Sequence, residues 1–160
     1  MKALRFWKAV TVDRSDFLER VVALLQEGAV RYCVLGDLAV NAYAEPVVTL
    51  DFDIAVALED LSRTESLLNF AAAGSNLRVQ LQKDSRYCSF VSRSQVRNVL
   101  GLTLPVAAIE DVLRGKIWAV QDPGRRPSKR QKDLADIARL LETSPQLRGL
   151  VPAEILARLF

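Results

Sequence analysis

The chain has 160 residues, of which 50% are hydrophobic and 26% charged, and its formal net charge is +3. This composition predicts a folded domain with a substantial core and excludes a disordered protein. The sequence contains no histidine, which excludes imidazole bases, Ser-His and Cys-His nucleophile pairs and most zinc sites. Any catalysis must therefore depend on Asp, Glu, Lys, Arg and main-chain groups.

The two cysteines, Cys33 and Cys88, both lie in apolar stretches. Because they allow only one pair and no secretory signal is recognised, we expect a reduced, cytoplasmic protein. No apolar run reaches the ~18 residues that a membrane span requires, so no membrane partner is expected.

The periodicity of apolar residues predicts the first elements in chain order. They are a helix at 15–28 that ends at Gly28, a buried strand of about five residues from 31, a short helix that begins near Asp37, and a second strand at Val47–Val56. A helix at 58–74, stopped by Gly74, and a strand at 76–83 follow, whereas 86–94 is ambiguous between helix and strand.

The second half of the chain predicts two strand pieces around Gly101, then helices at 108–121, 131–142 and 152–160, with a loop at 122–130. This order indicates an α+β (α/β-like) fold with a small mixed β-sheet flanked by helices. We expect a core at 1–107 and a helical part at 108–160 that packs on it as one compact unit.

The strand at Val47–Val56, which reads VVTLDFDIAV, places Asp51 and Asp53 on one face, about 7 Å apart for a rise of roughly 3.3 Å per residue. Two carboxylates at this distance repel each other, and burying them unpaired is costly. A divalent ion such as Mg²⁺ would relieve the repulsion, since it binds one or two carboxylates together with substrate phosphates. The alternative is a solvated face of an edge strand, with arginines as counter-ions.

A glycine turn precedes this strand. In VLGDLAVNAY, residues 34–43, Gly36 lies between a strand and the start of a helix. Such a turn directs free N–H groups and the positive end of the helix dipole at an anion. An anion-binding turn beside a carboxylate pair is the arrangement that nucleotidyl transfer requires.

Residues 34–56 resemble the opening motifs of the nucleotidyltransferase superfamily that includes DNA polymerase beta: an apolar strand, a glycine turn, a short helix and a strand with Asp-x-Asp. Residues 109–141, with a lysine in an apolar helix, a basic loop and Asp-Leu-Ala-Asp, resemble small bacterial proteins akin to abortive-infection nucleotidyltransferase toxins. The resemblance implies transfer of a nucleoside monophosphate from a nucleoside triphosphate to a hydroxyl on RNA, protein or a small molecule, with Mg²⁺ or Mn²⁺ as cofactor.

The resemblance also implies roles for particular residues. Gly36 would form the turn beneath the phosphates, Asp51 and Asp53 would be catalytic metal ligands, and Lys116 would approach the nucleotide. Asp133 or Asp136 would line the same cleft. From the residues alone, however, Lys116 could be a surface lysine, and Asp133 and Asp136 could pair with Lys132 and Arg139 on the helix surface.

The basic loop and the helix after it hold Arg125, Arg126, Lys129, Arg130 and Lys132. Such a run is either solvated surface or a contact for phosphates or an RNA backbone such as that of tRNA. We expect this run at the rim of the cleft, with Arg126 and Lys132 among the nucleotide-binding residues.

Two features depart from the family pattern. Asp37 stands where the family usually has Gly or Ser, and we expect it to cap the helix by accepting the N–H of Ala39 or Val40; the alternative is a metal or nucleotide contact. The family's third carboxylate, on a later strand, is also missing.

That later strand offers only Gln80 and Gln82 on its polar face, and Asp84 beyond its end is the nearest candidate. These departures favour a second interpretation, a catalytically degenerate nucleotidyltransferase fold that acts as a binding partner in a toxin–antitoxin-type system.

Overall fold

The computed structural model describes residues 2–11, 16–69 and 78–160. Its centre is a five-stranded mixed sheet with the order β3-β2-β1-β5-β4. The strands are β1 (Tyr32–Val34), β2 (Asp51–Val56), β3 (Arg78–Gln82), β4 (Gln95–Val99) and β5 (Leu102–Val106). β1 is antiparallel to β2 and parallel to β5, β2 is parallel to β3, and β4 is antiparallel to β5. The predicted α+β fold with a small mixed sheet is confirmed.

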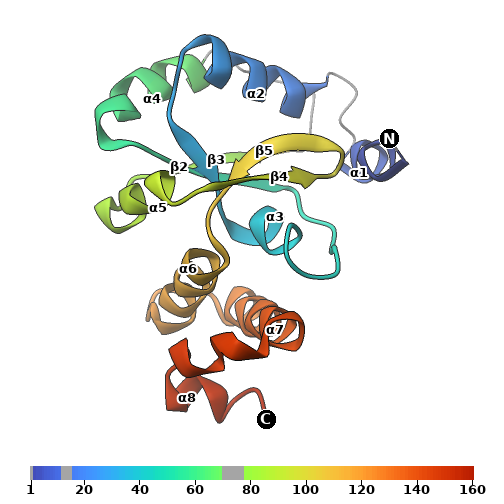
Figure 1. Cartoon of the computed structure of the whole chain (residues 1–160), viewed down its shortest axis with the longest axis vertical. Coiled ribbons are helices and arrows are strands. Elements are labelled where there is room, and N and C mark those ends of the chain that lie inside the picture. The colour runs from blue at the N-terminus through green and yellow to red at the C-terminus, as the bar shows by residue number, and fades with distance from the viewer. Residues whose placement is uncertain (1, 12–15, 70–77) are drawn as a thin grey trace.

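Helices cover both faces of the sheet (Figure 1). They are α1 (Lys2–Thr11), α2 (Phe17–Glu27), α3 (Gly36–Val40), α4 (Leu61–Asn69), α5 (Cys88–Ser92), α6 (Ile109–Gln121), α7 (Pro127–Thr143) and α8 (Ala153–Leu156), with 3₁₀ turns η1 (Leu58–Asp60), η2 (Ser85–Tyr87) and η3 (Pro145–Leu150). α2 and α4 lie over one face, whereas α3, α6 and α7 lie on the other side, and α8 is farthest from the sheet. Within the described ranges, no helix combines the length and the apolar character needed to cross a bilayer.

The predicted periodicities are visible in the burial of the elements. α2 turns its apolar stripe inward and stops at Gly28. In β2, Phe52 and Ile54 are fully buried, as expected of the face opposite the aspartates. The predicted strand pieces around Gly101 form the β4–β5 hairpin, in which Leu100 and Gly101 both have positive φ. Positive φ at both central residues matches the twist of tight hairpins.

Several predicted boundaries were wrong. The strand expected from Val47 begins only at Asp51, because the Asn41 side chain bonds both N–H and C=O of Val47 and replaces a neighbouring strand there. α7 begins at Pro127, inside the predicted loop, since proline suits the first turn of a helix. The ambiguous segment 86–94 is mostly helical, in η2 and α5.

The ends of two other predicted elements, 70–74 and 76–77, lie outside the described residues. The helix predicted at 152–160 is only four residues long, in α8, and α1 was not predicted.

Candidate active site

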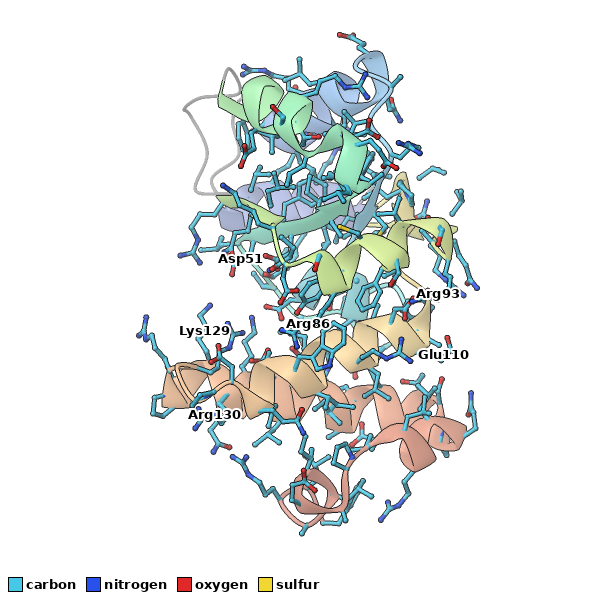
Figure 2. The ribbon with its side chains drawn as sticks, turned by 90° about the vertical axis from the view of Figure 1, so that its left-hand side faces the viewer. Asp51, Arg86, Arg93, Glu110, Lys129 and Arg130 are labelled. Carbon is cyan, nitrogen blue, oxygen red and sulfur yellow. The ribbon has the colours of Figure 1, made fainter. Side chains whose placement is uncertain are left out.

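A cavity of about 440 Å³ lies between the aspartate end of β2 and the helices α6 and α7. Most of the residues that line it are charged or can donate hydrogen bonds. They include Gly36, Asp37, Asp51, Asp53, Arg78, Gln80, Gln82, Asp84, Arg86, Tyr87, Gly115, Lys116, Trp118, Arg125, Lys129, Lys132 and Asp133. Figure 2 shows Asp51 on the sheet side and Lys129 on the helical side of this region.

Asp51 is buried at the start of β2 and has cationic partners. The parallel register sets Asp51 beside Arg78 of β3, and Arg78 Nη2 lies 2.7 Å from Asp51 Oδ1. Lys129 Nζ, from α7, lies 3.6 Å from Asp51 Oδ2. β2 lies between β1 and β3, so it is not the edge strand of the alternative interpretation, although an arginine counter-ion is present.

Asp53 differs from Asp51 because its carboxylate forms no hydrogen bond or ion pair with the described residues. Burial and the charges of Asp51 and Asp37 raise the pKa of Asp53 to about 6. The cavity therefore contains a carboxylate without a partner among the described residues, beside one that is paired only to exposed or partly exposed cations. Hard oxygen ligands of this kind are what Mg²⁺ and Mn²⁺ prefer, so the donor set fits a divalent ion.

Gly36 is the residue that allows Asp53 to occupy this position. Its φ is +62°, and a Cβ on it would lie 2.2 Å from Asp53 Oδ2. Any other residue would meet both backbone strain and a steric clash with the carboxylate. The turn predicted from VLGD is thus formed, and the backbone of Gly36 lies against the Asp53 side chain.

Lys116 is buried in the middle of α6, where three carboxylates surround its ammonium. Its Nζ lies 2.5 Å from Asp37, 3.0 Å from Asp133 and 2.7 Å from Asp136. Although burial opposes the charge, these carboxylates raise the pKa of Lys116 above its ordinary value. The interpretation of Lys116 as a surface lysine was therefore wrong.

Asp37 does not cap α3, contrary to expectation. The N-cap of that helix is Leu35, without a side-chain bond, and the Asp37 carboxylate instead binds Lys116 and Lys132. Although burial opposes its ionisation, these two lysines hold the pKa of Asp37 well below its ordinary range. Hydrogen bonds from two charged ammonium groups stabilise an aspartate more strongly than hydrogen bonds from neutral backbone N–H groups do.

Carboxylate oxygens of Asp37, Asp133 and Asp136 lie within 4.8 Å of one another, a spacing that would suit a metal ion. The Lys116 ammonium already occupies this cluster. Asp133 also binds Arg125, and Asp136 binds Arg139 as in the alternative interpretation, whereas Lys132 binds Asp37. Both aspartates are buried rather than on the helix surface.

The basic residues of 125–132 divide into two groups. Arg125, Lys129 and Lys132 line the cavity. Arg126 is exposed at the N-cap of α7 and is not among the cavity-lining residues. Arg130 donates to the carbonyls of Asp122 and Arg125 at 2.8 and 3.1 Å and so holds the loop closed. Only the first group is placed to meet a ligand in the cavity.

β3 contributes no carboxylate to the cavity. Arg78, Gln80 and Gln82 are its cavity-lining residues. Asp84 lines the cavity beyond the end of the strand, but its carboxylate is bound by Arg86 at 2.7 Å. The third carboxylate expected of the family therefore has no equivalent on this strand.

The cavity has an aromatic wall that was not predicted from the sequence. Tyr87, Phe90 and Trp118 form a cluster with ring centroids 5.2–5.7 Å apart, and Tyr87 and Trp118 line the cavity. Two of these rings lie in the ambiguous segment 86–94 and the third on a helix some 30 positions later. The aromatic residues in 87–90 were the available signal, but their sequence did not indicate that they would pack against Trp118 of α6.

No protein-family model matches the chain, and no curated protein matches it. Seven chains of solved structures match it in structure. One is the antibiotic-resistance factor ANT(2'')-Ia, whose solution structure aligns with a TM-score of 0.64 and 11% identity over 92% of this chain and 94% of that one. Another is an antigenic nucleotidyltransferase-like protein from Paracoccidioides brasiliensis, with a TM-score of 0.50 and 19% identity over 91% and 88%. The chain therefore has a nucleotidyltransferase-like fold.

Proposed function

We propose that the protein is a metal-dependent nucleotidyltransferase, which transfers a nucleoside monophosphate from a nucleoside triphosphate to a hydroxyl on RNA, protein or a small molecule. The main support is the position of Asp51 and Asp53 on one wall of a cavity whose opposite wall supplies Arg125, Lys129 and Lys132. Carboxylates on one side and cations on the other suit a metal-bound polyphosphate.

Asp51 and Asp53 are the proposed ligands of Mg²⁺ or Mn²⁺. The ion, when bound, would neutralise phosphate charge and activate the attacking oxygen. Asp53 has no competing partner, whereas Asp51 must exchange Arg78 and Lys129, which would then be free to bind phosphate oxygens. Lys116 is proposed to act near the nucleotide by keeping the charge of Asp37 neutralised.

A second function is favoured by one observation, the absence of a carboxylate on the cavity face of β3. Without a base for the attacking hydroxyl, the same cavity would bind a nucleotide but transfer it slowly or not at all. The protein would then act as a binding partner, for example in a toxin–antitoxin-type system. Transfer of a labelled nucleoside monophosphate to an acceptor distinguishes the two functions.

The test is incubation with nucleoside triphosphates labelled at the α- or the γ-phosphate, Mg²⁺ or Mn²⁺, and total RNA and protein. We expect the α-label, and not the γ-label, to become attached to an acceptor. Asp51→Asn/Asp53→Asn should abolish this, whereas Glu154→Gln, an exposed change on α8, should not. Label that binds wild type but never reaches an acceptor would support the binding function instead.

A further inference from the structure

Arg86 lies on the cavity wall with its guanidinium group fixed in two directions. Its Cζ is 4.5 Å from the ring centroid of Trp118, so one face is covered by the indole. Its Nε and Nη2 lie 2.8 and 2.7 Å from Asp84 Oδ2, so one edge is also held. The side chain nevertheless remains 55% exposed.

Asp84 and Trp118 are themselves fixed. Asp84 Oδ1 accepts the N–H of Arg86 at 3.0 Å and caps η2. Trp118 stacks on Phe90 at 5.7 Å with an interplanar angle of 16°, and Phe90 is buried in the core. Tyr87 packs edge-on against both rings. Arg86 is therefore the outermost layer of a stack that is rooted in the core.

We propose that Arg86 is the platform on which the nucleobase of a bound nucleoside triphosphate stacks. The inference rests on the proposed function, which places the phosphates at Asp51 and Asp53. A guanidinium plane is an established stacking surface for bases, and its charge favours the electron-rich face of a purine. Gln80 and Gln82, which also line the cavity, offer amides that can both donate to and accept from the edges of a base.

Stacking suits Arg86 better than a phosphate contact does. Its charge is already neutralised by Asp84 at 2.7 Å, whereas Lys129 lies 3.6 Å from Asp51, so Arg86 offers an anion less than Lys129 does. What it presents to the cavity is a flat surface whose orientation is fixed in advance. A cavity of about 440 Å³ is in the range of nucleotide-sized ligands.

The experiment compares Mg²⁺-ATP with Mg²⁺-tripolyphosphate, which has the phosphates but no base, by titration calorimetry. Wild type should bind ATP at least about fivefold more tightly than tripolyphosphate, as expected for one stacked base. Arg86→Lys, which keeps the charge but removes the plane, should abolish this difference and leave tripolyphosphate binding unchanged. In a Trp7→Phe background, the fluorescence of Trp118 should respond to ATP and not to tripolyphosphate.

A second variant, Asp84→Asn, tests the platform by the direction in which the affinities for ATP and tripolyphosphate change. If the cavity only attracts anions, removing this negative charge should strengthen binding of both ligands. If Arg86 is a platform held by Asp84, ATP should lose affinity relative to tripolyphosphate. Circular dichroism of each variant checks that it is folded.

Two results would overturn the platform while leaving nucleotidyl transfer in place. One is equal affinity of wild type for ATP and tripolyphosphate. The other is an equal loss of both ligands in Arg86→Lys, which would make Arg86 a phosphate contact. Binding of neither ligand would overturn the proposed function together with the platform.

Discussion

Nζ of Lys116 lies 2.5 Å from Oδ1 of Asp37, although the two residues are 79 positions apart in the chain. The pair joins the first turn of α3, beside Gly36, to the middle of α6. Asp133 and Asp136 extend the contact to α7. One ammonium group thus ties the glycine turn to the two long helices that form the far wall of the cavity.

Replacing Lys116 with Met should strongly destabilise the protein. The change leaves three carboxylates clustered around an apolar side chain, and breaking a buried pair costs roughly 3–5 kcal/mol in free energy of unfolding. Urea denaturation at neutral pH measures this loss. Lys129→Met is the matched control, because Lys129 is a partly exposed lysine of the same cavity and its pair with Asp51 is long. Similar losses from both variants would contradict the structural role of Lys116.

Gly36→Ala should displace Asp53 as well as strain the backbone. A Cβ would lie 2.2 Å from Asp53 Oδ2 at a φ of +62°, and left-handed backbone alone costs a non-glycine residue about 1–3 kcal/mol. We expect lower stability together with weaker Mn²⁺ binding by calorimetry. Gly149→Ala is the control, since nothing lies within 4 Å of its added Cβ. Unchanged Mn²⁺ binding in Gly36→Ala would show that Asp53 is not a ligand.

Local pattern was enough to predict the sheet, α2, α6 and the glycine turn, because each has a strong period or a clear stop signal. The shared face of Asp51 and Asp53 also followed from strand alternation alone. The resemblance to nucleotidyltransferases then gave the right fold.

The partners of the charged residues could not be predicted in this way. Asp37 reads locally as a helix cap, and its two lysines come from helices that are far away in sequence. Asp133 and Asp136 read as surface charges of an exposed helix, because their burial depends on Lys116 lying opposite them. The Asn41 side chain shortens the predicted strand by bonding to the backbone of Val47, and secondary-structure propensities do not describe such contacts.

Asp53 should make the stability of the protein depend on pH. Its folded pKa of about 6 lies above the ordinary value of 3.8, so the folded state binds this proton more tightly than the unfolded chain. Stability from this group is present below about pH 4 and is lost as the pH rises through 6. Asp53→Asn should therefore raise the free energy of unfolding near pH 8 by about 3 kcal/mol and change little near pH 4.

Urea denaturation at both pH values checks the effect of Asp53→Asn. Asp84→Asn should have the opposite sign, because its hydrogen bond to Arg86 lowers the pKa of Asp84, so that its carboxylate stabilises the fold once ionised. A destabilised Asp53→Asn at high pH would mean that Asp53 has a cationic partner in solution.

The two cysteines should differ in reactivity. Cys33 is fully buried in β1, and burial raises the pKa of its thiol to about 12, whereas Cys88 is half-exposed at the start of α5. Because the thiolate is the reactive form, a maleimide at neutral pH should label Cys88 in the folded protein and Cys33 only after denaturation. Peptide mass spectrometry identifies the labelled residue, and Cys88→Ser should leave the folded protein unlabelled. Rapid labelling of Cys33 would contradict its position in the core.

The arrangement of the sheet has a consequence for synthesis on the ribosome. β1 pairs with β5, so Val34 cannot form this strand pair until Val106 has been synthesised. Asp37 likewise cannot bind Lys132 until the chain is 95 residues longer. Domains fold as units while the chain emerges from its N-terminus, and a nascent chain that ends near residue 107 would expose Asp37 without either lysine. The two carboxylates of β2 would likewise lack the cations of the far wall. The proposed nucleotide binding should therefore be possible only after α7 has left the ribosome, and a stalled or truncated product should be inert.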